Sequence, residues 1–548
     1  MRSFLPVFVY PLFLFSIASG QQTYLVTGIL ESGTVTIPDS TDTFTFNSEA
    51  AFALNAQYVS FTQNGVRDSE YGVWIGNLST GTVKQLVKLG DLAGKSGVTF
   101  TDFGAYSVVT GNSTAGYWVV FSGETTAGDG LYSVPATGGS AGILADQSTL
   151  LPGVGGTGTY NFGYTPYAVP SGDSQHVVFT PYSPSAAFID TLNGKSLGEL
   201  AGANTPIEVA NSNCAESNLY FQEPRIFGQN AIFMGGGSPF DWVNAALYLT
   251  TPSGIPLNGE TCGPPNNFLV YAPLLDASTV LDPNFPDLRY GGNNGNSLQA
   301  IDNQSIYFTD GTQSALFSVS LASLGSIKPL LEPSTQLPNM PPPPYTINSL
   351  AAENGTAVFE ASVVYNAGAS AGIFATNGGQ ISRITGTGDV FFGNLTVGYG
   401  LALNPNAISN GRIAFGVYGG QAGLVLAKPA TCAVDVTASV KAVFGPIQPT
   451  STPGQQYQVV KVTNTSNQSV NGPITLAFYG LPSTVSLVSV QGSGVTKCTA
   501  LVPLGSPYLT VSANALSPNG SVTTKVVYNN PNSLPISYTP KVFSGVNR

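Results

Sequence analysis

Apolar positions along the chain follow a two-part phrase that recurs seven times. Its first half ends in Phe after an aliphatic or small residue pair, and its second half runs small residue, apolar residue and, in six copies, an aromatic residue. The first halves are Val59-Ser-Phe61, Val119-Val-Phe121, Val177-Val-Phe179, Ala231-Ile-Phe233, Ile306-Tyr-Phe308, Ala357-Val-Phe359 and Ile413-Ala-Phe415. The second halves are Gly72-Val-Trp74, Gly130-Leu-Tyr132, Ala186-Ala-Phe188, Ala246-Leu-Tyr248, Ala315-Leu-Phe317, Gly372-Ile-Phe374 and Gly423-Leu-Val425. Short apolar runs bounded by turn residues predict pairs of β-strands.

The spacing of the phrase predicts how these strand pairs are arranged. Successive Phe positions differ by 60, 58, 54, 75, 51 and 56 residues. A repeat of this length is typical of β-propellers, in which four-stranded sheets stack around an axis and bury one another's faces. We therefore predict an all-β fold with a seven-bladed β-propeller. Six or eight blades are the alternatives, and a row of separate β-sandwiches is the competing architecture.

The two ends of the repeat region predict how the ring closes. The seventh copy has no third strand before the chain leaves at Lys428-Pro429. A strand near Thr23 to Ile29 can supply it, because closing the ring with strands from both ends removes an exposed sheet edge. We expect this strand to pair beside Gly423 to Leu426.

The repeat stops after Thr431, and the last part of the chain has a different rhythm. Its apolar runs, separated by turn residues at short spacing, predict an immunoglobulin-like β-sandwich. The candidate strands are Val434 to Phe444, Gln456 to Thr463, Ile474 to Tyr479, Ser486 to Val490, Tyr508 to Ser512, Ser521 to Tyr528 and Ile536 to Val542. The predicted division is residues 21–428 for the propeller and 429–548 for the sandwich.

Residues 1–20 read as a signal peptide. Arg2 supplies a positive charge, Leu5 to Ile17 is apolar, and Ala18-Ser-Gly20 offers small residues for cleavage before Gln21. The rest of the sequence has no apolar run of about 20 residues, so no membrane span is expected after cleavage. These features predict a secreted, extracellular protein.

The low content of charged residues and the net negative charge limit which binding partners are expected. Charged residues are only 9% of the 548, the formal net charge is −11, and the 18 basic residues form no run. Nucleic acid is therefore not expected as a partner, because its binding needs clustered Lys and Arg. An extracellular protein or glycan is the expected partner.

The even number of cysteines fits an oxidising compartment. The four cysteines fall into two local pairs, and we expect disulfides between Cys214 and Cys262 and between Cys432 and Cys498, each within one domain. Chance alone would produce about as many N-x-S/T sequons as occur here, so glycosylation depends on the source organism. The sequons are at Asn77, Asn112, Asn303, Asn354, Asn394, Asn464, Asn467 and Asn519.

Two resemblances support this division. The phrase over residues 50–428 resembles the repeats of secreted TolB-like propellers, although the Asp-rich turn of that family is matched best only by Gly172-Asp-Ser-Gln175. Segments such as Val462-Thr-Asn-Thr-Ser466 and Gly505-Ser-Pro-Tyr508 are similar to C-terminal immunoglobulin-like modules of secreted bacterial proteins, which are usually accessory. Neither resemblance brings a catalytic residue to this chain.

The sequence offers few side chains for catalysis or metal binding. His176 is the only histidine, so a Ser-His-Asp triad or a histidine-ligated zinc is not expected, and we predict no catalytic residue, no metal and no resident cofactor. Calcium at Asp302 and Asp310 is an alternative, since both lie at turns rich in oxygen ligands. Paired carboxylates of a glycosidase are another, with Glu223, Asp302, Asp310 and Glu360 as candidates.

Aromatic side chains could bind a ligand directly. Trp74 and Trp118 fall in or beside the phrase and are expected in the core. Trp242 lies outside it, in the longest interval of the repeat, and is the best candidate for a ligand-facing aromatic. Arg225, Arg289 and Tyr290 are its polar helpers.

Three functions follow from these observations. A secreted, non-enzymatic protein of binding, adhesion or surface and matrix interaction is favoured, because charge is low and no nucleophile–base pair is present. The alternatives are a secreted glycan-active hydrolase that uses channel carboxylates and a lectin-like carbohydrate-binding propeller.

Overall fold

The computed structural model describes residues 22–31, 52–63, 71–149, 170–181, 186–192, 197–201, 220–236, 246–252, 259–261, 269–271, 273–276, 279–290, 297–365, 368–393, 395–398, 400–418, 422–488, 490–501 and 503–548. The signal peptide, Trp242, the Cys214–Cys262 pair and the Asn394 sequon lie outside these residues. The described part is all-β, and it contains no helix with the length and hydropathy of a membrane span.

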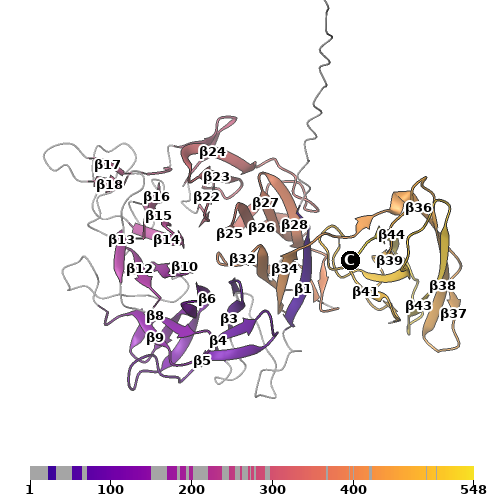
Figure 1. Cartoon of the computed structure of the whole chain (residues 1–548), viewed down its shortest axis with the longest axis horizontal. Helices are drawn as coiled ribbons and strands as arrows, with labels where there is room; N and C mark the ends of the chain where they lie inside the picture. Colours follow the sequence, from indigo (N-terminus) through magenta and orange to yellow (C-terminus); the bar gives the residue numbers. More distant parts are fainter. Residues whose placement is uncertain are drawn as a thin grey trace, which may run out of the picture.

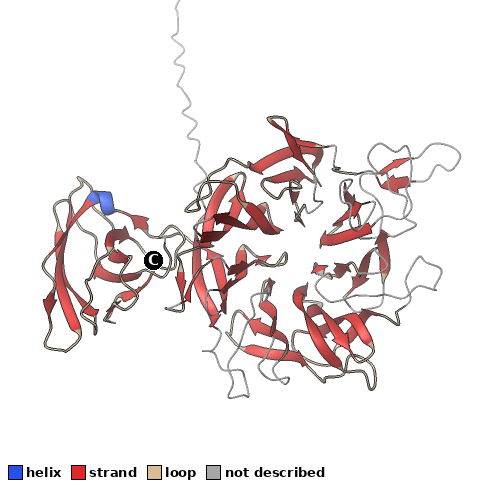
Figure 2. Ribbon diagram, turned by 180° about the vertical axis from the view of Figure 1, so that it is seen from behind, coloured by secondary structure: helices blue, strands red, loops and turns tan. Residues whose placement is uncertain are grey.

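Antiparallel sheets stand around a common axis and form a propeller-like ring (Figures 1 and 2). In the described residues, the ring contains seven sheets of three to five strands. In chain order the first four consist of β2 (Ala53–Leu54), β3 (Tyr58–Gln63), β4 (Gly72–Asn77) and β5 (Val83–Lys88); β6 (Phe100–Asn112), β7 (Gly116–Thr125), β8 (Gly128–Pro135) and β9 (Gly142–Asp146); β10 (Ser171–Gly172), β11 (His176–Phe179), β12 (Ala187–Thr191) and β13 (Gly198–Ala201); and β14 (Tyr220–Phe227), β15 (Asn230–Gly236) and β16 (Ala246–Thr250).

The other three sheets of the ring complete it, and small hairpins decorate it. The sheets consist of β21 (Gln299–Ile301), β22 (Ser305–Thr309), β23 (Leu316–Ser320) and β24 (Ser323–Leu331); β25 (Thr346–Glu353), β26 (Thr356–Tyr365), β27 (Gly368–Asn377) and β28 (Gln380–Gly386); and β31 (Gly400–Ala402), β32 (Ile408–Ser409), β33 (Arg412–Tyr418), β34 (Ala422–Pro429) and β1 (Tyr24–Glu31). The hairpins pair β17 (Gly259–Thr261) with β18 (Leu269–Tyr271), β19 (Val280–Asp282) with β20 (Phe285–Arg289), and β29 (Val390–Phe391) with β30 (Leu395–Thr396).

The two halves of the sequence phrase meet as cross-strand partners. In every copy the last residue of the first half pairs directly with the last residue of the second half, from Phe61 with Trp74 to Phe415 with Val425. In five copies the two rings also stack: Phe121–Tyr132, Phe179–Phe188, Phe233–Tyr248, Phe308–Phe317 and Phe359–Phe374, with ring centroids 5.5–6.0 Å apart. Such pairs contribute about 0.5–1.5 kcal/mol each beyond their burial. The phrase therefore places an aromatic pair in the core of six of the seven sheets.

Glycine in the second half of the phrase makes room for the aromatic ring. A Cβ added to Gly372 would lie 2.7 Å from the ring of Phe374, and one added to Gly130 would lie 2.9 Å from the hydroxyl of Tyr132. The aromatic side chain thus folds over the glycine two residues earlier on the same strand. Trp74 is buried as expected, whereas Trp118 is only half-buried and packs at the edge of its cluster.

The N-terminal strand closes the ring, as its sequence predicts. β1 runs antiparallel to β34, with Tyr24 opposite Pro429 and Glu31 opposite Gly423, and a bulge at Ile29 interrupts the register. The other edge of β1 contacts the C-terminal unit: the amide of Val26 donates to the carbonyl of Lys497 at 2.7 Å, and Leu25 bridges to Cys498. Both edges of this strand are therefore paired.

The C-terminal unit consists of two sheets over a shared core of aliphatic and aromatic residues such as Val460, Leu476 and Phe478. One sheet has the order β35 (Val434–Asp435), β44 (Thr539–Ser544), β39 (Ile474–Tyr479), β42 (Pro507–Ser512) and β41 (Ser493–Val495). The other has the order β36 (Val440–Phe444), β38 (Gln455–Asn464), β43 (Ser521–Asn529) and β40 (Ser486–Leu487), with β37 (Gln448–Pro449) beside β38.

Two details of this unit refine the sequence prediction. The expected disulfide is present between Cys432 and Cys498, whose Cα atoms are 5.6 Å apart. The single strand expected from Val434 to Phe444 is instead two strands in opposite sheets, separated by the 3₁₀ turn η2 (Thr437–Ser439). The Asp435 carboxylate accepts the Thr437 amide at 2.9 Å and stabilises the turn that carries the chain between the sheets.

Candidate functional site

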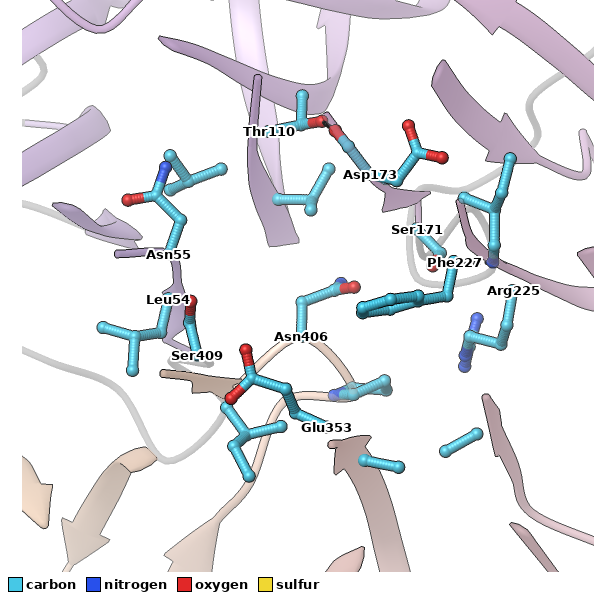
Figure 3. A pocket seen from close by; sticks show the side chains of 18 of the residues that line it. Leu54, Asn55, Thr110, Ser171, Asp173, Arg225, Phe227, Glu353, Asn406 and Ser409 are labelled. Carbon is cyan, nitrogen blue, oxygen red and sulfur yellow. Dashed lines mark hydrogen bonds between the residues drawn. The ribbon is translucent and has the colours of Figure 1, made fainter. Parts of the chain in front are cut away.

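A cavity of about 170 Å³ lies where the innermost strands of the ring converge (Figure 3). All seven sheets of the described ring contribute to its wall, through β2, β6, β10, β14, β21, β25 and β32 or the residues that follow them. The polar side chains around it belong to Asn55, Thr110, Ser171, Asp173, Arg225, Glu353, Asn406 and Ser409. We call this the central cavity.

Half of the polar residues that line the cavity occupy the same position in their copies of the repeat. The residue six places before the Phe of the phrase begins or borders the turn between the innermost and second strands of its sheet. In chain order these residues are Asn55, Ala115, Asp173, Phe227, Asp302, Glu353 and Ser409, and all but Ala115 and Asp302 line the cavity. One repeat position therefore supplies residues from five of the seven sheets to a common site.

The carboxylates of the cavity are already engaged by backbone amides. Glu353 accepts the amides of Asn410 and Gly411 at 2.8 Å each, one on each oxygen. Oδ1 of Asp173 accepts the amides of Gln175 and His176, both at 2.7 Å. These groups hold turns in place, which suits a binding site better than proton transfer.

Amide side chains provide hydrogen-bonding capacity at the same site. Oδ1 of Asn55 accepts the amides of Gln57 and Tyr58, which leaves Nδ2 as a buried donor without a hydrogen-bond partner in the described residues. Nδ2 of Asn406 donates across the ring to the carbonyl of Pro170 at 3.0 Å. A buried donor without a partner costs free energy, so Asn55 favours a polar occupant of the cavity.

The predicted ligand residues separate in space. Arg225 lines the central cavity, is only 6% exposed and donates from Nη1 to the carbonyl of Pro224. Arg289 is exposed on β20 and is not part of the cavity. Tyr290 is fully buried, with its ring edge-on to Phe308 at 5.7 Å, so it packs in the core instead of facing a ligand.

The predicted carboxylates also have separate roles. Asp302 is fully buried and accepts the amides of Gln304 and Ser305, and Asp310 accepts those of Ser314 and Ala315. One oxygen of each carboxylate thus holds the backbone of its own turn. In the part of the chain that the structure describes, no three His, Cys, Asp or Glu side chains cluster as metal ligands would. The side chain of Glu223 lies outside the described set.

Glu360 differs from the other carboxylates. It lies on β26, is 8% exposed and accepts a hydrogen bond from Nδ2 of Asn348 at 3.1 Å. Burial raises the pKa of its carboxyl from 4.5 to about 7. Burial, followed by the charge of Glu360, also raises the pKa of Tyr418 on the neighbouring sheet. An acid with a pKa close to neutrality can both donate and accept a proton.

The sequons lie in different surroundings. Asn303, Asn354, Asn467 and Asn519 are exposed, and Asn77 and Asn112 are half-buried. Asn464 is fully buried, and its Nδ2 donates to the carbonyls of Gln468 and Leu516. Both hydrogens of the Asn464 amide are thus used within the fold.

Comparisons with known proteins show a similarity of fold and nothing more. No family model matches the chain, and no curated protein sequence matches it. Among solved structures it is similar to a prolyl endopeptidase, with a TM-score of 0.39 and 9% identity over 82% of this chain, although the chain spans only 56% of that protein. It is also similar to an ulvan lyase, with a TM-score of 0.37 and 9% identity over 73% of this chain and 95% of that one. The β-propeller domain of the trilobed protease from Pyrococcus furiosus gives a TM-score of 0.29 and 10% identity over 61% of this chain and 95% of that one.

Proposed function

We propose that this is a secreted, non-enzymatic binding protein, in which a seven-bladed β-propeller carries a small polar ligand in the central cavity and an immunoglobulin-like sandwich follows it. The ligand class that fits best is one sugar unit of an extracellular glycan. The observation that carries the proposal is the cavity wall, which Arg225, Asn55 and Asn406 line together with two carboxylates that already accept backbone amides.

The size of the central cavity supports a small ligand. Its volume of about 170 Å³ is below the ~300–1,000 Å³ of pockets that enclose drug-sized molecules. A single polar unit at the end of a longer chain fits such a space. Hydroxyl groups can both donate and accept, so they complement a wall of amides, hydroxyls and one guanidinium.

An isosteric substitution tests this proposal on the mature chain, residues 21–548. Asn55→Asp keeps the oxygen that holds the turn but replaces the Nδ2 donor by a second oxygen. Asp occupies the equivalent repeat position at Asp173 and Asp302, so the fold tolerates it there. Asn77→Asp is the matched control, because Asn77 holds a turn through Oδ1 in the same way but lies outside the cavity.

On a glycan array, we expect the wild-type chain and Asn77→Asp to bind the same glycans, and Asn55→Asp to bind them at least about tenfold more weakly, since a lost donor leaves a ligand acceptor unpaired. Equal binding by Asn55→Asp, or no glycan bound by the wild-type chain, would refute the proposal.

A second candidate is favoured by Glu360 alone. A secreted glycan-active enzyme could use this carboxyl as a general acid or base, because burial raises its pKa to about 7. The test is release of new sugar ends from a panel of polysaccharides, with Glu360→Gln as the variant. An enzyme of this kind should lose about 10²–10⁴-fold in rate when the acid–base group is replaced. Absence of release by the wild-type chain removes this candidate.

A further inference from the structure

Charge is distributed very unequally between the two parts of the chain. Residues 429–548 contain six Lys or Arg and a single acidic residue, Asp435, whereas residues 21–428 contain 11 basic and 28 acidic residues. The C-terminal unit is therefore a cationic module, with a formal charge of +5, attached to a ring region of −17. The net negative charge of the whole protein therefore does not reveal that its C-terminal unit is positively charged.

Half of the basic residues of the module lie on one sheet face. Lys441 on β36, Lys461 on β38 and Lys525 on β43 are exposed. Lys441 pairs with Thr463 and Lys461 with Thr523, whereas Lys525 pairs with Val459, so each lysine is diagonal to the next on the adjacent strand. Diagonal neighbours on one face are about 7–8 Å apart. The three ammonium groups therefore form a line across the strands.

Apolar side chains accompany this line. On the same strands and the same face, Val443 is 50% exposed and Val459 is 43% exposed. Lys525 Nζ lies 4.0 Å from the ring centroid of Tyr457, and the Tyr457 hydroxyl hydrogen-bonds to Gln448. We call the surface of these three lysines, two valines and Tyr457 the distal face.

The distal face carries uncompensated positive charge and is open. Asp435, the one acid of the module, pairs with Lys541 at 3.0 Å on the other sheet. Within the described ranges, no ion pair involves Lys441, Lys461 or Lys525. Figure 1 places β38 and β43 on the side of the module that faces away from the ring. At physiological salt the charge of the ring is screened beyond about 8 Å.

We propose that the distal face binds a linear anionic polysaccharide. A linear polyanion can pair with all three lysines in turn, and the apolar faces of its sugar rings can pack on Tyr457, Val443 and Val459 between the charges. The phosphates of a nucleic-acid duplex offer no apolar surface to these residues.

Substitution of the three lysines tests the proposal in the mature chain. The variant is Lys441→Gln, Lys461→Gln and Lys525→Gln together. The control is Lys88→Gln, Lys328→Gln and Lys428→Gln, which removes the same charge from exposed positions of the ring. Binding of both, and of the wild-type chain, to alginate and heparin is measured against dextran and a DNA duplex at two salt concentrations.

We expect the wild-type chain and the control to bind alginate or heparin more tightly at low salt and to ignore dextran. The distal-face variant should bind about tenfold more weakly, because exposed charge contacts are individually weak but accumulate. Equal binding by the distal-face variant would overturn the proposal. Preference for the DNA duplex, or loss of salt-dependent self-association in place of glycan binding, would assign the face to nucleic acid or to a second copy and would also overturn it.

Discussion

Arg383 Nη1 lies 2.9 Å from Asp389 Oδ2, and both side chains are buried where the ring meets the C-terminal unit. The same carboxylate accepts the hydroxyl of Thr385 and the amide of Gly386, and its other oxygen accepts the amide of Leu504 from the C-terminal unit at 2.9 Å. A single buried carboxylate therefore joins the two parts of the chain.

The first prediction concerns this ion pair. Asp389→Ala should lower the free energy of unfolding by about 3–5 kcal/mol, because Arg383 is left as a buried, uncompensated charge. Urea denaturation checks this value. Replacing both partners by apolar residues (Arg383→Met with Asp389→Leu) should be less harmful than Asp389→Ala alone. A double variant that is more damaged than the single one would contradict this account.

The second prediction concerns closure of the ring by β1. Val26→Pro removes the amide that donates to the Lys497 carbonyl and should destabilise the protein by about 1–3 kcal/mol, because that carbonyl is left without its donor. Ile29→Ala is the control, since Ile29 lies at the bulge and is 40% exposed, and it should change stability by no more than about 0.5 kcal/mol. Thermal unfolding distinguishes the two. Similar melting temperatures for both variants would show that pairing of β1 does not hold the ring.

The third prediction concerns glycine in the phrase. Gly372→Ala places a methyl group 2.7 Å from the Phe374 ring, which must move from its stack on Phe359, so stability should fall by about 1–3 kcal/mol. Gly398→Ala is the matched control, because no atom lies within 4 Å of its added Cβ and its φ is not positive. Chemical denaturation of both variants measures the difference, and an unaffected Gly372→Ala would contradict the packing argument.

The fourth prediction concerns pH. The pKa of Glu360 is raised in the folded state from 4.5 to about 7. The folded protein therefore binds more protons than the unfolded chain between these values, and Glu360 makes stability fall as pH rises through this window. The total effect is about 3 kcal/mol at ~1.4 kcal/mol per pKa unit.

Glu360→Gln removes the titrating group. Relative to the wild-type protein, this variant should become more stable as pH rises from 4 to 8, by about the same 3 kcal/mol. Urea denaturation at both pH values measures the change. A stability difference between the two proteins that does not vary with pH would show that burial of Glu360 does not shift its titration.

Sequence reasoning located strands better than sites. The pairing of Phe359 with Phe374 and the position of β1 beside β34 follow from local apolar patterning and from the need to cover a sheet edge. Arg225, a ligand residue expected from the sequence, lines the central cavity. Tyr290, the other polar helper expected near Trp242, is instead buried in the core.

The residues missed at the cavity carried a signal in the sequence. Asn55, Asp173 and Glu353 all stand six positions before the Phe of the phrase, and the offset becomes meaningful once that position is known to be a turn at the axis. The strand expected from Val434 to Phe444 was wrong for a related reason. Apolar alternation continues through the 3₁₀ turn, while the hydrogen bond that the Asp435 carboxylate accepts from the Thr437 amide stabilises the turn to the other sheet.

The sequence by itself determined the hairpins, the aromatic pairs within them, the partner of the N-terminal strand and the Cys432–Cys498 disulfide, because each depends on local pattern or on a simple edge rule. The tertiary structure alone decided which side chains share a site. Asn406 follows Pro170 by 236 residues in the sequence, yet its side chain donates a hydrogen bond across the ring to the Pro170 carbonyl. Stacking of sheets around an axis brings equivalent turns together, and burial between sheets shifts the pKa of Glu360. Neither effect can be read from the residues next to it in the chain.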